Sequence, residues 1–226
     1  MLSRHEEKYI LTYAQYAILR QRVQQVLQPD SHGDGGTYTL TSLYFDDPED
    51  TGLYEKLDGL KLHTKYRLRT YDCDGSFIKL ERKDKMGILT KKTTASIQKD
   101  QLPLLTQPGQ QDALPESLHS LYAQLQAGGY RPKVGVRYVR DAFYHTGSDL
   151  RVTFDRDLEA IPPDEKALFD PSFRGIPALE AGSVILEIKY DSFLPPFISE
   201  LFHDIPKISS AISKYSQCLE RIMAIV

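Results

Sequence analysis

Polar and charged side chains recur at every second position in several segments of this sequence, where the positions between them are mostly apolar or aromatic. Because successive side chains of a β-strand point to opposite faces, such positions share one face of a strand. The segments carry Arg4, Glu6 and Lys8; Lys65, Arg67 and Arg69; Lys79, Glu81 and Lys83; Arg151, Thr153 and Asp155; and Glu187 and Lys189. The spacing predicts strands with one face of mixed charge.

This face of mixed charge has two interpretations. It could be the solvated exterior of an ordinary antiparallel sheet. Alternatively, Arg and Lys could bind phosphate oxygens through charge-assisted hydrogen bonds inside a barrel with a polar lumen. Carboxylates among them would repel a polyanion unless they held a divalent cation. The second interpretation therefore predicts a ligand composed of a metal and a polyphosphate.

The basic residues are concentrated in one part of the chain. Between residues 56 and 99, twelve Lys or Arg stand against five Asp or Glu, although the whole chain has a net charge of −3. A local basic segment in an acidic protein favours an anionic partner. RNA is a further candidate, but Tyr66, Tyr71 and Phe77 alternate with the basic positions on the face predicted to pack. We therefore expect no nucleic acid.

The strands and helices that must position these residues follow from hydrophobic periodicity. Strands are predicted at 4–11, 37–45, 62–71, 76–84, 88–96, 133–146, 149–156 and 183–190. Helices are predicted at 13–28, 114–128, 196–203 and 206–225, with a short one ending near residue 57 and a surface loop at 157–182. With no linker or repeat, the chain is expected to form a single, mostly antiparallel β domain over residues 1–226.

Composition excludes several classes of protein. The 226 residues are 41% hydrophobic, which is typical of a globular chain. Two Cys are too few for a disulfide framework, and residues 1–7 lack the apolar core of a signal peptide. No apolar run approaches the ~20 residues of a membrane-spanning helix. A cytoplasmic location is expected. His5 is not part of an H-E-x-x-H motif, and the Gly-rich stretch 33–36 lacks the remainder of a P-loop.

Eight short motifs occur in an order that resembles a known family. They are R-x-E-x-K-Y at 4–9, S-L-Y-F-D at 42–46, K-x-R-x-R-x-Y at 65–71, F-I-x-L-E-x-K at 77–83, R-x-A-F at 140–143, R-V-x-F-D at 151–155, L-E-I-K at 186–189 and S-K-Y at 213–215. Together they resemble the VTC domain, the polyphosphate polymerase domain of the vacuolar transporter chaperone complex. This domain is a branch of the triphosphate tunnel metalloenzymes, which are CYTH-like. The resemblance runs from residue 4 to about residue 220.

The resemblance implies an α+β fold, with an antiparallel eight-stranded β tunnel or barrel, a basic lumen and peripheral helices. It implies a divalent metal, Mn or Mg, and transfer of the terminal phosphoryl of ATP to a growing polyphosphate chain. Hydrolysis of tripolyphosphate or nucleoside triphosphates, and a non-catalytic polyphosphate-binding module, are the alternatives. Expected partners are ATP, polyphosphate or tripolyphosphate, and pyrophosphate. A membrane partner protein could hold the chain at the inner face of a membrane.

The resemblance also assigns residues. The phosphate cradle, which would carry catalysis, comprises Lys8, Arg67, Arg69, Lys83, Arg140 and Arg151. Further phosphate contacts are expected from Lys56, Lys65, Lys91, Lys92, Lys189 and Lys214. Glu187 is the first choice for a metal ligand, followed by Glu6 and Glu81.

The sequence departs from the family pattern in two places. The wider superfamily begins with E-x-E-x-K, whereas Arg4 stands at the first of these positions here, as is usual in the VTC branch. This replacement removes one metal ligand and weakens the prediction of a plain triphosphatase. Near the end of the chain, Lys214 lacks the second lysine of the yeast-type polymerase, since Ala211 precedes it. Between Lys91 and Lys92, the sequence leaves open which one points inward.

Overall fold

The computed structural model describes residues 4–57, 62–87, 89–191, 193–203, 205 and 212–224, without the side chains of Arg4, residues 55–57 and Leu62. The strands are β1 (Arg4–Thr12), β2 (Gln28–Pro29), β3 (Thr37–Asp46), β4 (Leu62–Tyr71), β5 (Ile78–Met86), β6 (Leu89–Ile97), β7 (Arg131–Tyr144), β8 (Arg151–Ile161), β9 (Ile176–Pro177) and β10 (Ser183–Asp191). The helices are α1 (Tyr13–Gln24), α2 (Thr51–Leu57), α3 (Glu116–Ala127), α4 (Glu165–Phe169), α5 (Pro196–Leu201) and α6 (Lys214–Met223), with 3₁₀ helices η1 (Lys99–Thr106) and η2 (Gln111–Ala113). All eight predicted strands are confirmed, with shifted ends.

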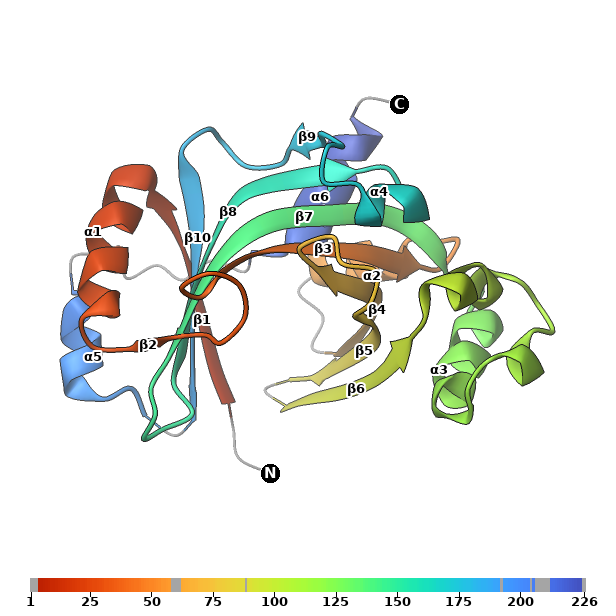
Figure 1. Ribbon diagram of the computed structural model, residues 1–226, viewed down its shortest axis with the longest axis horizontal. Helices are drawn as coiled ribbons and strands as arrows, with labels where there is room; N and C mark the ends of the chain where they lie inside the picture. Colours follow the sequence, from red (N-terminus) through yellow and green to blue (C-terminus); the bar gives the residue numbers. More distant parts are fainter. Residues whose placement is uncertain are drawn as a thin grey trace. The chain divides into compact units, whose positions relative to one another are not determined.

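The strands form one large sheet (Figure 1). Backbone hydrogen bonds join them in the order β1-β10-β8-β7-β3-β4-β5-β6, and β2 and β9 pair with β7 and β8. The pairings of β1, β4 and β5 with their neighbours are antiparallel. Among the described residues, β1 and β6 are the two ends of this path, so the sheet is open. The α+β class is confirmed, whereas the predicted closed barrel is not.

The exposed side chains of β6 are consistent with its place at the end of the path. Lys91 and Lys92 lie in its centre, and its first six residues, Leu89 to Thr94, are exposed. Charged side chains, Lys above all, are a common means of keeping an edge strand from pairing with another strand.

The chain divides into two compact units. Unit 1 comprises Met1–Thr39, Tyr138–Leu158 and Leu179–Ile212, and unit 2 comprises Leu40–Arg137, Glu159–Ala178 and Ser213–Val226. Each unit has its own hydrophobic core. The sequence predicted one domain over residues 1–226, and that assignment stays a prediction.

In unit 1, helix α1 packs beside α5 and against β1 and β10 (Figure 1). Thr12 caps α1, because its hydroxyl accepts a hydrogen bond from the backbone of Gln15, whose side chain accepts one from the backbone of Thr12. One stripe of α1 is buried, at Tyr16, Leu19 and Val23, and the helix ends at Gln24, before the predicted residue 28. These side chains meet Phe154 and other apolar residues of β8 and β10, so α1 covers the apolar face of these strands.

In unit 2, helix α3 packs against β6 and η1. The buried face of α3 carries Leu118, Leu121, Tyr122 and Leu125, which join Leu80 of β5 in the core. This packing leaves the opposite face of β4 and β5 to their charged side chains.

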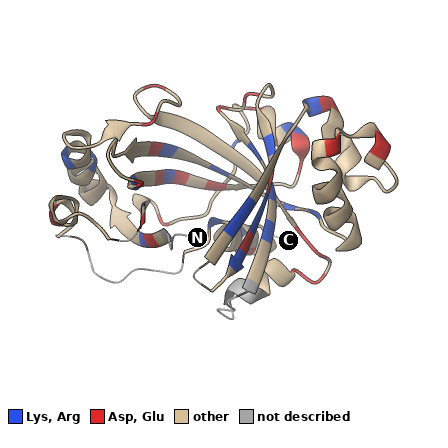
Figure 2. Cartoon of the chain, turned by 90° about the horizontal axis from the view of Figure 1, so that it is seen from below, with Lys and Arg blue, Asp and Glu red and all other residues tan. Residues whose placement is uncertain are grey.

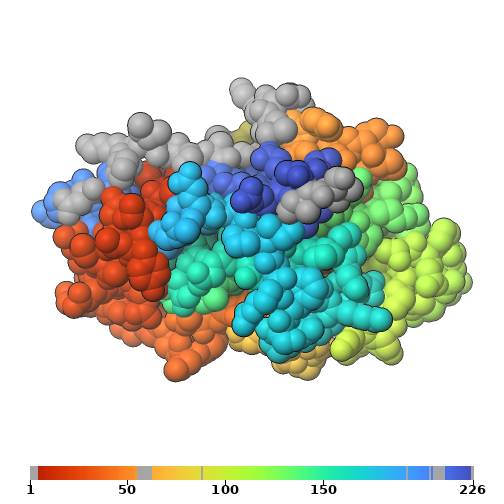
Figure 3. Space-filling model, turned by 90° about the horizontal axis from the view of Figure 1, so that it is seen from above, coloured from red at the N-terminus to blue at the C-terminus, as the bar shows by residue number. Residues whose placement is uncertain are grey.

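The prediction of a loop at 157–182 is wrong in part. Strand β8 continues to Ile161, and the segment also contains α4 and β9. Buried Arg137 fixes this segment, since its guanidinium donates to the carbonyl oxygens of Ala167, Asp170 and Phe173 at 2.6, 3.0 and 2.7 Å. Residues 165–182 appear in cyan to light blue on the surface shown in Figure 3.

No helix in the described part of the chain is both long and apolar enough to cross a membrane.

Candidate functional site

The charged face of unit 2 is built by β4, β5 and β6, and Figure 2 shows basic and acidic positions distributed along the strands. In the register of these strands, Arg67 pairs with Glu81, while Lys65 pairs with Lys83, which pairs in turn with Lys92. Directly paired residues lie on the same face of a sheet. The predicted face is therefore confirmed for these residues. We call Lys65, Arg67, Arg69, Glu81, Lys83 and Lys92 the unit 2 cluster.

Glu81 lies at the centre of the unit 2 cluster. Its carboxylate is buried, lies 2.7 Å from Nε of Arg67 and 3.9 Å from Nη1 of Arg69, and also pairs with Lys92. Burial alone would raise the pKa of Glu81, but the neighbouring charges of Arg67, Arg69 and Lys92 lower it to about 2. Glu81 is therefore ionised at neutral pH and holds several cations that would otherwise repel one another.

The structure separates Lys91 from Lys92. Lys92 lies on the face of Lys65 and Lys83, whereas Lys91 pairs with Asp84 on the opposite face. The structure therefore places Lys92 in the cluster and Lys91 outside it.

Helix α6 borders the unit 2 cluster through its first residues. Nζ of Lys65 donates to Oγ of Ser213, the residue that caps α6, at 3.2 Å. The same ammonium lies 5.3 Å from the ring centre of Tyr215. The buried hydroxyl of Tyr215 donates to Asp46, which also accepts from the backbone of Gly52 at 3.0 Å. Asp46 therefore joins β3 and α2 to the first turn of α6, which begins at Lys214.

The charged face of unit 1 is built by β1, β10 and β8. Lys8 pairs with Glu187, and Glu6 pairs with Lys189, which pairs in turn with Arg151. This register confirms that the alternating positions share one face, as predicted. We call Glu6, Lys8, Arg140, Asp155, Glu187 and Lys189 the unit 1 cluster.

Two carboxylates approach one ammonium in the unit 1 cluster. Nζ of Lys189 lies 2.6 Å from Oε1 of Glu187 and 4.0 Å from Oε2 of Glu6. Nζ of Lys8 lies 2.8 Å from the other oxygen of Glu6 and donates to the carbonyl of Ile212 at 3.4 Å. Burial lowers the pKa of Lys189 to about 8, because it outweighs the attraction of Glu187 and Glu6.

Arg140 and Asp155 form a bidentate ion pair next to Glu187. Nε and Nη2 of Arg140 donate to the two oxygens of Asp155 at 2.6 and 2.8 Å. Asp155 is 1% exposed and the side chain of Arg140 is 11% exposed. Nη2 also lies 3.8 Å from Oε2 of Glu187. Asp155 therefore compensates the charge of Arg140 and fixes the orientation of its guanidinium.

Arg151 extends away from the unit 1 cluster toward the loop after β2. Its Nη2 donates to Asp30 at 2.5 Å and to the hydroxyl of Tyr38 at 3.1 Å. The remaining predicted residue, Lys56, has a side chain outside the described part.

The predicted metal ligands divide between the two units. Glu6 and Glu187 approach the same ammonium in unit 1, whereas Glu81 belongs to the unit 2 cluster. In the described part of the chain, no group of three or more His, Cys, Asp or Glu is placed to hold a metal ion. Two carboxylates nevertheless suit Mg²⁺ or Mn²⁺, since Mg²⁺ commonly binds one or two carboxylates together with substrate phosphates. Glu6 and Glu187 fit this type of site.

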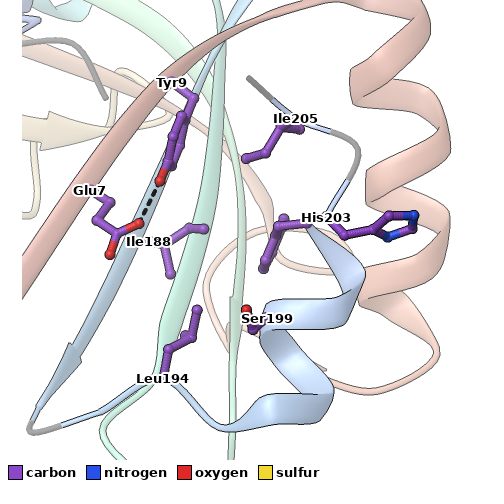
Figure 4. A pocket seen from close by; sticks show the side chains of 8 residues that line it. Glu7, Tyr9, Ile188, Leu194, Ser199, His203 and Ile205 are labelled. Atoms are coloured by element: carbon purple, nitrogen blue, oxygen red, sulfur yellow. Dashed lines mark hydrogen bonds between the residues drawn. The ribbon is translucent and has the colours of Figure 1, made fainter. Parts of the chain in front are cut away.

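A cavity of about 250 Å³ lies elsewhere in unit 1, between α5 and the strands β1 and β10 (Figure 4). Glu7 stands in its wall and accepts hydrogen bonds from the hydroxyls of Tyr9 and Tyr190 at 2.5 and 2.6 Å. Apolar side chains such as Leu194 and Phe202 form much of the rest of the lining. The cavity contains none of the predicted phosphate-binding residues.

Sequence reasoning did not assign two side chains at these clusters to the site. Tyr44 and Asp155 each contact a predicted arginine. Both lie in motifs that the sequence analysis singled out, and Tyr44 shares with Ser42 and Asp46 the strand face opposite Leu43. The alternation in the S-L-Y-F-D motif could have identified Tyr44.

These features define an α+β protein whose sheet presents arginines and lysines held by a few buried carboxylates, an arrangement suited to anionic substrates. A sequence model of the VTC domain matches residues 3–223. The chain therefore belongs to the VTC domain family. This membership supports an enzyme of triphosphate-related phosphoryl transfer as the class of protein.

Solved structures of low sequence identity resemble this fold. The PH1819 protein from Pyrococcus horikoshii OT3 is 12% identical, with a TM-score of 0.52 over 96% of this chain and 99% of that chain. A putative adenylate cyclase from Bacillus halodurans is 11% identical, with a TM-score of 0.49 over 90% of this chain and 89% of that chain. The first of these supports the fold. A comparison with curated proteins finds no match.

Proposed function

We propose that this chain transfers the γ-phosphoryl group of ATP to a growing polyphosphate chain with the help of a divalent metal. The observation that carries the proposal is the unit 2 cluster, in which five cationic side chains share one sheet face around a single buried carboxylate. This excess of positive charge matches a polyanion. The VTC membership of the chain supports the same substrate class.

The chemistry that such residues perform is positioning and neutralisation of charge. Phosphoryl transfer passes through a loose transition state with negative charge on the equatorial oxygens, and the attacking and leaving oxygens lie in line. Guanidinium and ammonium groups held in place before the reaction stabilise that charge without reorganisation. Arg67 and Arg140 suit this role, because Glu81 and Asp155 fix their orientation.

The chemistry that a bound divalent metal would supply here is neutralisation of part of the phosphate charge. Glu187 and Glu6 are the residues that would hold it. Nζ of Lys189 contacts both of these carboxylates. We also propose that the chain adopts the family's tunnel fold, and that a membrane partner accompanies it.

The acceptor decides between polymerase and hydrolase. If the end of a phosphate chain lies in line with the transferred group, the polymer grows, and if water lies there, the substrate is hydrolysed. To test the proposal, the purified protein is incubated with ATP and Mn²⁺. Polyphosphate is then separated on a gel, and ADP and free phosphate are assayed. Long chains together with ADP are expected. Free phosphate without chains would identify a hydrolase, and tight polyphosphate binding without either product would identify a binding module.

The substitution Glu187→Gln tests the metal site. Gln keeps the size of the side chain but removes its charge, so the Mn²⁺ concentration needed for half-maximal activity should rise at least about tenfold. Mn²⁺ binding, measured by calorimetry, should weaken in parallel, while tripolyphosphate binding without metal should persist. Glu159→Gln, on β8 but outside both clusters, is the matched control. Unchanged Mn²⁺ binding in Glu187→Gln would remove this residue from the metal site.

A further inference from the structure

Tyr44 in β3 pairs directly with Arg67 in β4. Nη1 of Arg67 donates to the Tyr44 hydroxyl at 2.9 Å, while Nε of the same guanidinium donates to Glu81 at 2.7 Å. The centre of the Tyr44 ring lies 5.2 Å from the centre of the Tyr215 ring in α6. Tyr44 therefore connects Arg67 to the helix that Asp46 holds through Tyr215.

We propose that Tyr44 is a positioning residue of the unit 2 cluster, which fixes the guanidinium of Arg67 for phosphate binding, and that loss of its hydroxyl proton weakens phosphate binding because the phenolate cancels positive charge in the cluster. The proposal rests on the proposed function for the identity of the anion. It assigns Tyr44 a role that depends on pH, in addition to its packing against α6.

The geometry explains the positioning. An arginine with a single acceptor can turn about that hydrogen bond, whereas two acceptors on Nε and Nη1 fix the plane of its guanidinium. Glu81 and Tyr44 supply these two acceptors from the two strands that flank β4. The neutral phenol holds Nη1 without cancelling the positive charge of Arg67, which a second carboxylate would do.

The surroundings of Tyr44 explain the dependence on pH. Charged and titratable groups reach it from three elements, namely Lys65, Arg67 and Arg69 on β4, Glu81 on β5 behind Arg67, and Tyr215 on α6. Burial alone would raise the pKa of Tyr44, but the three cations of β4 outweigh it and lower the pKa to about 8. Above that pH the phenolate would neutralise part of the cluster and repel a bound polyanion.

The proposal is tested by calorimetry, which measures the affinity of the wild type and of Tyr44→Phe for tripolyphosphate from about pH 7 to about pH 9. At pH 7, Tyr44→Phe should bind about tenfold more weakly, because Arg67 loses an acceptor that fixes it. Between these pH values the wild type should lose more affinity than the variant. Lys189 titrates in both proteins, so the difference between their pH profiles isolates Tyr44. Tyr54→Phe, at an exposed tyrosine of α2, is the matched control and should behave as the wild type.

A titration of tyrosinate absorbance separates this proposal from the proposed function. One tyrosine with a midpoint near pH 8 should be present in the wild type and in Tyr54→Phe and absent in Tyr44→Phe. Arg67→Met should shift this midpoint upward, and this result does not depend on any phosphate ligand. If the wild type binds no tripolyphosphate but the titration behaves as expected, the proposed function fails while the link between Tyr44 and Arg67 stands. The proposal would be overturned if the wild type and Tyr44→Phe had equal affinities and equal pH profiles. A tyrosine midpoint near pH 8 that persists in Tyr44→Phe would also overturn it.

Discussion

Replacement of Arg67 by alanine should lower kcat/KM for ATP-dependent polyphosphate synthesis by about 100- to 1000-fold. This corresponds to about 2.7–4 kcal/mol of transition-state stabilisation, the cost of removing one preorganised donor from developing negative charge. Arg67 is expected to have this effect because Glu81 and Tyr44 hold its guanidinium in one orientation. Steady-state kinetics at saturating Mn²⁺ measures the change, and far-UV circular dichroism verifies that the variant is folded.

Arg82→Ala is the matched control for Arg67→Ala. Arg82 lies on β5 opposite Tyr66, on the other face of the sheet, where it donates to Asp84 at 2.8 Å. Loss of an arginine from that face should change kcat/KM by less than about threefold, since a surface ion pair contributes little. If both variants lose activity equally, the effect comes from the net charge of the sheet and not from the geometry at Arg67.

Asp155→Asn should destabilise the protein by about 3–5 kcal/mol, the usual cost of removing one partner from a buried ion pair. Both oxygens of Asp155 accept hydrogen bonds from Arg140. The other carboxylate near this guanidinium belongs to Glu187, whose Oε2 lies 3.8 Å from Nη2 of Arg140. The substitution therefore leaves a buried guanidinium with little compensation. Urea unfolding followed by circular dichroism measures the loss and suits a chain without Trp.

The double variant Asp155→Asn/Arg140→Met distinguishes a charge effect from a packing effect. Removal of both charges should restore most of the lost stability, because an apolar side chain can replace a buried ion pair at little cost. The activity should remain low, since Arg140 is a predicted phosphate ligand. A single Asp155→Asn variant with unchanged stability would contradict the assigned role of the pair.

The local sequence determined which side chains share a strand face. The period of two in segments such as 65–71 depends only on backbone geometry within one strand, so Arg67 and Arg69 could be assigned to the same face without knowledge of their neighbours. The register confirms this assignment at Arg67 and Glu81. The helix predicted at 13–28 was equally accessible, because its apolar periodicity is a local pattern, although the helix ends at Gln24.

Tertiary structure alone decided which charges meet. The partners of Arg140 and the choice of Lys92 over Lys91 depend on the register between strands, and a shift of one residue would reverse every face. The link between Asp46 and Tyr215 joins residues 169 positions apart, and no local pattern encodes it. The sequence thus determined the two faces of each strand through local geometry. Long-range pairing and burial then determined which cations are held in one orientation and which are exposed on the surface.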